Sequence, residues 1–343
     1  MDKETFFKVK QTFQDNYFKC IKPNLDQFEE KRKKYLANAN IVAPIFGALA
    51  VLYFFFYSSL GQESCNLNIV IGLGIVAATC HKYAQWLLNT EIKKVVMPGI
   101  CKCFEDLSYR DSSYELLENY EQTGIVENYN ISFVDDVLIG KYKNIDFEII
   151  KTSLRKDYKN KGKSTLSLFA DPNYSLYKSI KILFYILGFS AYLAAKTGIG
   201  QGNSKKVFNG VILKIKNAKT FTSHTLIKPD SKIKITNLNL SHTEFEDVVF
   251  EKKYDVYSND PVDARYLITP AFMERINNVN DVFNAQKLSC AFYQNDIYIG
   301  IETKTELFSP CNIRKPVNDA SGFVNLFQEI VCVYRLIEYL KLS

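Results

Sequence analysis

Two long stretches near the N-terminus are almost entirely apolar. Residues 37–62 contain no charged residue, and residues 67–88 contain one lysine and one histidine, both near their end. About 20 apolar residues in a helix are needed to cross the core of a bilayer. The pattern therefore predicts a two-helix transmembrane hairpin within residues 37–90, with spans at about 41–60 and 67–88.

The flanks of these spans set their orientation. Lysine and arginine crowd residues 29–36 before the first span and residues 81–94 at the end of the second, whereas the loop between them carries only Glu63. Because basic flanks stay in the cytoplasm, we expect both termini there. We place Pro44 in the first turn of its helix, where a missing N–H costs little. A buried hairpin in a soluble core is the disfavoured alternative.

A third apolar run is shorter. Residues 182–195 lack charge, and a basic, polar stretch precedes them at 153–166. This length is short for a span and fits either a helix lying on the membrane surface or a helix of the core. We assign the run to an insertion at about 152–206, because a crossing would separate strands that we place in one domain.

The remaining pattern predicts an α+β protein. Residues 1–36 form an amphipathic helical segment with a break at Pro23. Residues 91–343 form a cytoplasmic body, an antiparallel sheet with a closing C-terminal helix. Its expected elements are a hairpin at 131–151, a strand at 207–216 with a bulge or close approach at Gly210, short strands at 224–238 joined by a Pro-Asp turn, extended chain at 241–258, a hairpin at 289–303 and a helix in the last 25 residues.

The segment "YDVYSNDPVDARYLITPAFMERINNV", residues 254–279, concentrates polar and charged side chains. Asp260 and Thr269 each precede a proline and a helical pattern, which predicts two N-caps. Capping does not explain four other side chains, which we take as candidate ligand or partner contacts: Arg265, Tyr266, Glu274 and Arg275. Arg265 could instead pair with an aspartate of its own short helix, or it could recognise a carboxylate or phosphate.

Candidate catalytic and metal-binding residues are few. The eight cysteines are scattered, and the C-x-C pair at residues 101–103 has no second pair at zinc spacing, so we expect no metal and no cofactor. No hydrolase, metalloprotease or nucleotide-binding motif occurs, and we do not expect an enzyme. "GIGQGN", residues 198–203, lacks the flanking strand and helix of a phosphate loop. We interpret Asp135 and Asp136 as the edge of a turn.

The distribution of charge along the chain limits the kinds of partner that we expect. The net charge of +6 is concentrated beside the apolar segments, which disfavours nucleic acid and favours the lipid bilayer. The sequence does not indicate an oligomeric state.

Residues 254–276 resemble the signature of a bacterial family called domain of unknown function 3137. The matching positions are Val256, Tyr257, Ser258, Asp260, Ala264, Arg265, Tyr266, Thr269, Pro270, Met273, Glu274 and Arg275. The strand with Phe208 and Gly210, the hairpin at 291–302, the final helix and the paired spans are similar to that family as well. The resemblance implies a protein anchored in the bacterial cytoplasmic (inner) membrane, without an assigned activity, and a LemA-type membrane protein as a partner. The insertion departs from the family pattern.

These observations predict a membrane-anchored interaction or scaffold module on the cytoplasmic side of the bacterial inner membrane. Two alternatives remain open at this point. One is a regulatory domain that binds a ligand or an anion, and the other is a component of a transport or envelope assembly.

Overall fold

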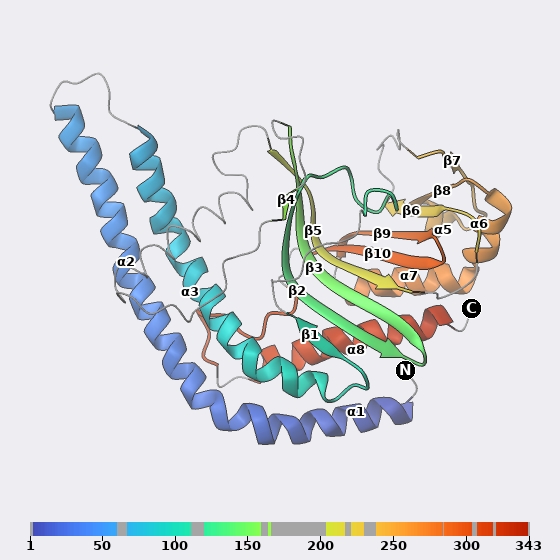
Figure 1. Ribbon diagram of the computed structural model, residues 1–343, viewed down its shortest axis with the longest axis horizontal. Helices are drawn as coiled ribbons and strands as arrows, with labels where there is room; N and C mark the ends of the chain where they lie inside the picture. Colours follow the sequence, from blue (N-terminus) through green and yellow to red (C-terminus); the bar gives the residue numbers. More distant parts are fainter. Residues whose placement is uncertain are drawn as a thin grey trace.

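The computed structural model describes residues 3–59, 67–110, 120–158, 164–165, 204–216, 221–229, 238–283, 285–303, 307–317 and 320–341. A pair of long helices extends away from an α+β body built on one sheet (Figure 1). We call the two helices, α2 and α3, the arm, and the rest of the described chain the body. The α+β class, the antiparallel sheet and the C-terminal helix are thereby confirmed.

The N-terminal helices form one bent run. It comprises α1 (Lys3–Asn16), a π-helical turn (Tyr17–Ile21), a 3₁₀ turn (Lys22–Asn24) and α2 (Leu25–Ser59). The predicted break at Pro23 is this bend, where proline removes a backbone donor. The side-chain amide of Asn24 donates to the Cys20 carbonyl at 2.8 Å, so the irregular turn keeps its hydrogen bonding. The helix α2 continues through residues 36–37, between the predicted N-terminal segment and the predicted hairpin.

The arm pairs α2 with α3 (Leu67–Cys101) along much of their length (Figure 1). Near the body, the Tyr35 hydroxyl donates to Glu91 at 2.5 Å. Farther along, His81 Nε2 and Asn40 Oδ1 lie 2.8 Å apart. Pro44 lies well inside α2 rather than in a first turn, so that expectation is wrong: the helix begins at Leu25, before the apolar stretch. Residues 60–66, which connect the two helices, are outside the described residues.

Among the described residues, one helical run is long and apolar enough to cross a membrane. It is Lys3–Phe56, whose most apolar window has a mean hydropathy of 2.0 and is only 11% buried. The structure thus supports one apolar spanning helix in the N-terminal region. The pairing of two spans into a transmembrane hairpin stays a prediction.

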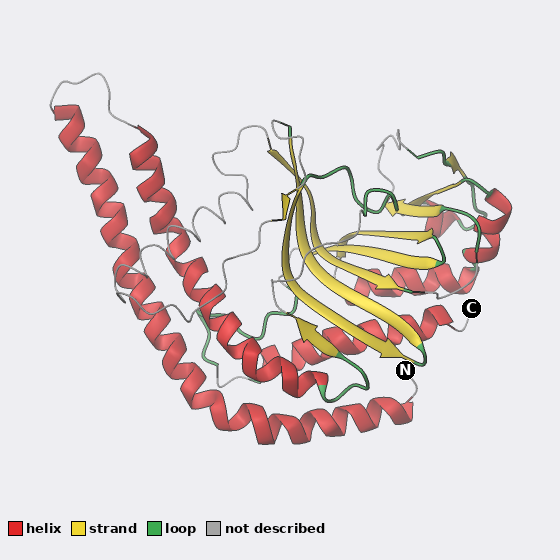
Figure 2. Cartoon of the chain, viewed as in Figure 1, coloured by secondary structure: helices red, strands yellow, loops and turns green. Residues whose placement is uncertain are grey.

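The described strands form a single sheet in the order β1-β2-β3-β5-β10-β9-β6-β8-β7 (Figure 2). Each neighbouring pair on this path is antiparallel, and β4 adds to β2 in parallel. The strands are β1 (Ser108–Arg110), β2 (Ile131–Tyr142), β3 (Ile145–Asp157), β4 (Ser164–Thr165), β5 (Ser204–Ile215), β6 (Thr225–Pro229), β7 (Ser241–His242), β8 (Tyr254–Ser258), β9 (Ala285–Tyr293) and β10 (Asp296–Thr303).

Both predicted hairpins form through two-residue turns. Lys143 and Asn144 join β2 to β3, and Gln294 and Asn295 join β9 to β10, all with positive φ. Such left-handed pairs match the right-handed twist of the flanking strands. Gly210 of β5 makes a close approach to β10, since a Cβ there would lie 1.9 Å from the Ile301 carbonyl oxygen.

Two expectations within the body are wrong. Residues 152–157, placed in the insertion, belong to β3 and pair with β5, and the apolar side chain of Leu154 is fully buried there. Residues 248–251, expected to be extended, form the one-turn helix α5 (Val248–Glu251), because the Asp247 carboxylate caps it. Three other predictions lie outside the described residues: the apolar run at 182–195, the glycine-rich loop at 198–203 and the turn and strand at 230–237.

Helices cover one face of the sheet. They are α6 (Pro261–Leu267), α7 (Pro270–Val282) and α8 (Ser321–Lys341), with α1 running beside α8 (Figure 1). The Phe13 ring of α1 stacks on Phe327 of α8, with the ring centroids 4.2 Å apart. The predicted face of α8 is fully buried, as the apolar spacing requires: Phe323, Leu326, Phe327, Ile330, Val333, Tyr334 and Ile337. The opposite face of the sheet packs against residues 120–129, through Tyr120, Ile125, Val126 and Tyr129.

Candidate functional site

The two predicted caps occupy helix starts. The Asp260 carboxylate accepts hydrogen bonds from the backbone N–H groups of Val262 and Asp263 at the start of α6. The Thr269 hydroxyl accepts from the N–H of Phe272 at 3.2 Å, at the start of α7. These side chains satisfy backbone donors that the helices leave open.

The four candidate contact residues do not converge on a cavity. Arg265 is exposed and donates to the Glu244 carbonyl at 3.3 Å, and within the described chain it forms no ion pair with Asp260 or Asp263. Tyr266 is 65% exposed, Glu274 is exposed and Arg275 is half-buried. The segment presents an open surface, and two cavities found elsewhere, one beside Gln85 and one beside β1, are lined by other residues.

A buried ionic cluster connects the arm to the sheet. Asp136, only 4% exposed, lies within β2 just after an irregularity in its pairing with β3, so the interpretation of a turn edge is wrong. Both of its carboxylate oxygens accept from Lys93 Nζ of α3, at 2.7 and 2.6 Å. The Tyr109 hydroxyl donates to it at 2.8 Å, and Lys151 Nζ lies 3.7 Å away. Burial alone would raise the Asp136 pKa, but Lys93 and Lys151 hold it below its usual range.

A second carboxyl group faces this cluster from α8. Glu329 accepts a hydrogen bond from the Phe308 N–H at 2.7 Å. Burial, with a smaller contribution from Asp136, raises the pKa of Glu329 to about 7 against the opposing effects of that N–H and of Lys151 and Lys93. Glu329 therefore changes charge near neutral pH, at a point where α8 meets the loop that follows the sheet.

That loop, residues 307–317, is fastened to the arm on two sides; we call these contacts the seam. On α2, Arg32 is held by Glu29 at 2.6 Å and donates to the Ile313 carbonyl at 2.8 Å. Glu29 also accepts from the Val317 N–H at 2.9 Å. The Arg32 hydrogen bond, with the Val317 N–H, lowers the Glu29 pKa to about 2 against the effect of burial.

On α3, Gln85 continues the seam. Its amide donates to the Cys311 carbonyl at 2.8 Å and accepts from the Ile313 N–H at 2.6 Å. One turn later, Asn89 donates to the Ser309 hydroxyl at 3.0 Å. Gln85 therefore binds the backbone of the loop and Asn89 binds a side chain of it, from one helix face that residues i and i+4 share.

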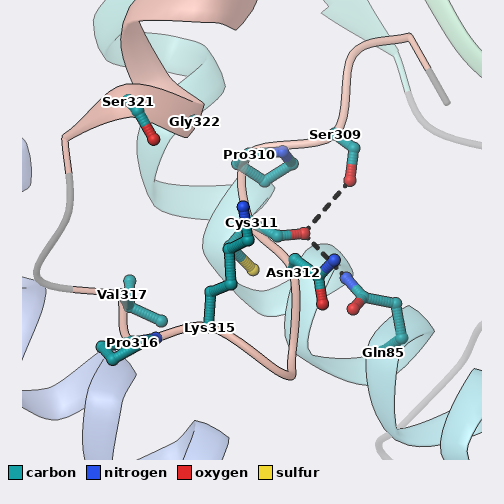
Figure 3. Close-up of a pocket in the computed structure, with 10 residues that line it drawn as sticks. All are labelled: Gln85, Ser309, Pro310, Cys311, Asn312, Lys315, Pro316, Val317, Ser321 and Gly322. Atoms are coloured by element: carbon teal, nitrogen blue, oxygen red, sulfur yellow. Dashed lines mark hydrogen bonds between the residues drawn. The ribbon is translucent and has the colours of Figure 1, made fainter. Parts of the chain in front are cut away.

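A cavity of about 490 Å³ opens beside the seam. Its walls come from Gln85 of α3, from loop residues 309–317 and from the start of α8, as Figure 3 shows. In the same view the Lys315 side chain extends from the loop in the direction of Pro310 and Cys311. Gly322 is needed here, since a Cβ would lie 2.1 Å from the Pro310 carbonyl oxygen.

Sequence reasoning missed the seam and the ionic cluster. A signal for the cluster existed, because two adjacent aspartates interrupt the apolar strand "ISFVDDVLIG", and a charge within a buried strand requires a partner. The partner, Lys93, is 43 residues away and could not be identified from spacing. Within the described residues, no group of three or more His, Cys, Asp and Glu side chains could hold a metal ion.

Comparison with known proteins gives one family. Residues 206–342 match the model of the family described as "Protein of unknown function (DUF3137)". The match starts in β5, so α1, the arm and strands β1 to β4 lie outside it, although the resemblance also included the paired apolar spans. No curated protein and no solved structure gives a match. Residues 206–342 thus match the DUF3137 family of proteins of unknown function, which the signature segment predicted.

Proposed function

We propose that this chain is a membrane-anchored interaction or scaffold module, in which α2 and α3 enter the bilayer and the body is held in one position beside it. The proposal places the protein at the bacterial inner membrane with both termini in the cytoplasm. A LemA-type partner in the same membrane belongs to the proposal because the family resemblance implies it.

The observation that carries the proposal is the exposed apolar surface of the arm. Eight large apolar side chains of α2 are at least 43% exposed: Ile41, Ile45, Leu49, Val51, Leu52, Phe54, Phe55 and Phe56. On α3, Ile69 and Ile71 are exposed as well. Soluble proteins rarely expose a contiguous apolar surface of this extent, whereas a lipid-facing helix requires one.

Both helices of the arm change from charged to apolar sequence at about the same distance from the body. Charged residues of α2 end at Lys34, and those of α3 begin at Lys82. The Asn40–His81 contact joins the two helices where the change occurs. This level would mark the boundary of the hydrocarbon core, with the seam and the body on the polar side.

Alkaline carbonate extraction of membranes from expressing cells tests the anchor. We expect the wild-type chain to stay in the membrane pellet. Leu49→Lys/Leu52→Lys should release much of it, since each lysine near the bilayer centre costs about 3 kcal/mol. The matched control Val248→Lys/Val249→Lys changes two exposed apolar residues of α5 and should stay in the pellet. Release of the wild-type chain by carbonate would contradict the proposal.

A further inference from the structure

The cavity beside Gln85 has no role in the proposed anchor. Its described lining combines polar side chains with the ammonium group of Lys315 and contains no carboxylate. Lys315 and the adjacent Arg314 are exposed, and neither forms an ion pair within the described part of the chain. A cavity whose described lining includes a cation but no counter-charge is complementary to an anion.

The cavity lies close to the level where the arm becomes apolar. Gln85 follows His81 by four residues, which is one helical turn or about 6 Å. His81 contacts Asn40, directly before the first exposed apolar residue of α2, Ile41. The headgroup layer on each side of a bilayer is about 5–8 Å thick. If the arm spans the membrane, the Gln85 wall of the cavity is at headgroup depth.

The loop that carries the two cations is held at this depth by the seam. Gln85 binds the backbone of Cys311 and Ile313, and Arg32 binds Ile313 from α2. These contacts fix the chain just before Arg314 and Lys315. Lys82, exposed on α3, adds a third basic residue one turn from Gln85 on the membrane side.

We propose that this cavity is a subsite for the phosphate group of an anionic membrane phospholipid, with Lys315 in its wall as the cation and the exposed Arg314 next to it in the chain. The inference rests on the proposed function, because the arm must enter the bilayer to bring the cavity to the headgroups. It adds a ligand class and a way to orient the body: a lipid bound at the loop would hold the body against the membrane surface.

Trp86, the only tryptophan of the chain, gives a local readout because it follows Gln85. The purified full-length protein is reconstituted in nanodiscs of phosphatidylcholine that contain either brominated phosphatidylglycerol or brominated phosphatidylcholine, and quenching of Trp86 fluorescence is measured. We expect the anionic lipid to quench more strongly, with roughly fivefold stronger relative binding for each basic residue that contacts it.

Arg314→Glu/Lys315→Glu should abolish this preference. The control Lys252→Glu/Lys253→Glu should retain it, because this exposed basic pair directly follows α5, which lies on the other side of the body from the arm in Figure 1. Equal melting of the variants and the wild type in pure phosphatidylcholine checks that all are folded. Arg314→Gln/Lys315→Gln replaces the double glutamate variant if that variant melts early.

Two results would overturn the inference. One is equal quenching by the two lipids in the wild type, and the other is a preference that survives in the Arg314/Lys315 variants. A further measurement with inorganic phosphate in detergent distinguishes a lipid headgroup from a free phosphate. If phosphate stabilises the protein and no lipid preference is seen, the cavity binds a soluble anion and the lipid assignment is overturned. A wild-type chain that carbonate extracts would instead refute the anchor itself.

Discussion

Asp136 shows how one buried charge can join distant parts of the chain. It lies in β2, yet its strongest partner, Lys93, comes from α3 and a further donor, Tyr109, from β1. A buried charge that loses its partner is costly, whereas a complete pair contributes little net stability. The cluster therefore specifies where the arm meets the sheet more than it stabilises the fold.

A double-mutant cycle on this pair gives the first prediction. Lys93→Met should lower the free energy of unfolding by about 3 kcal/mol, because it leaves the Asp136 carboxylate buried with only Lys151 and Tyr109. Lys93→Met/Asp136→Asn should cost less than the sum of the single changes, by about 2 kcal/mol. Chemical unfolding in detergent measures all three variants. Strict additivity would show that the two groups do not interact.

Glu329 gives the second prediction, on pH. Its pKa is raised from 4.5 to about 7 in the folded protein. The folded state therefore holds a proton that the unfolded state releases, and stability falls as pH rises from about 4.5 through about 7. Glu329→Gln should match the wild type near pH 5 and exceed its stability at pH 8, by at most about 3 kcal/mol.

Thermal unfolding of both proteins between pH 5 and pH 8 makes this comparison. Other carboxyl groups contribute equally to the wild type and the variant, so the difference between the two curves reports Glu329. A difference that does not change with pH would contradict a titrating Glu329.

At the scale of elements, the close crossing of β5 and β10 depends on Gly210. Gly210→Ala would place a methyl group 1.9 Å from a backbone oxygen, and we expect a loss of about 3 kcal/mol. The matched control is Gly300→Ala on β10, where a Cβ would meet the Phe208 ring at 3.3 Å, and a ring can shift. We expect it to cost about 1 kcal/mol. Equal unfolding free energies for the two variants would refute the close approach.

The sequence predicted those elements whose signal is local. The apolar spacing of α8, the turns at Lys143–Asn144 and Gln294–Asn295 and the starts of α6 and α7 depend on neighbouring residues, and the structure has all of them. The end of β3 was missed because Arg155, in a basic stretch, is 3% exposed inside the sheet, and only its pairing with β5 explains that burial.

The seam could not be predicted either, because its contacts join residues that are far apart in the sequence. Gln85 and Asn89 are ordinary polar residues near the end of the apolar stretch of α3. Their partners, Cys311, Ile313 and Ser309, follow more than 200 residues later in the chain. Arg265 and Tyr266 were predicted as contacts because they lie in a segment dense in polar and charged residues. The residues that line the cavity come from segments without such a signal.

For the whole molecule, several sets of contacts connect the arm to the body. The ionic cluster joins α3 to the sheet, the seam joins both arm helices to the loop before α8, and α1 packs on α8. The family match covers only residues 206–342, yet the contacts of α8 and its preceding loop extend to α1, α2 and α3. If the arm enters the bilayer, these contacts would hold the signature segment in a defined orientation relative to the membrane.

Labelling of native cysteines with a membrane-impermeant maleimide tests the central claim most directly. Cys20 is exposed in the turn before α2, and Cys65 lies in the sequence between the two predicted spans. Peptide mapping of intact and permeabilised cells identifies the labelled side chains without any substitution. If the arm spans the inner membrane with both termini in the cytoplasm, Cys65 is labelled in cells whose outer barrier alone is opened, and Cys20 only after the inner membrane is permeabilised. Labelling of Cys20 before the inner membrane is permeabilised, or labelling of Cys65 only after that step, would contradict the account.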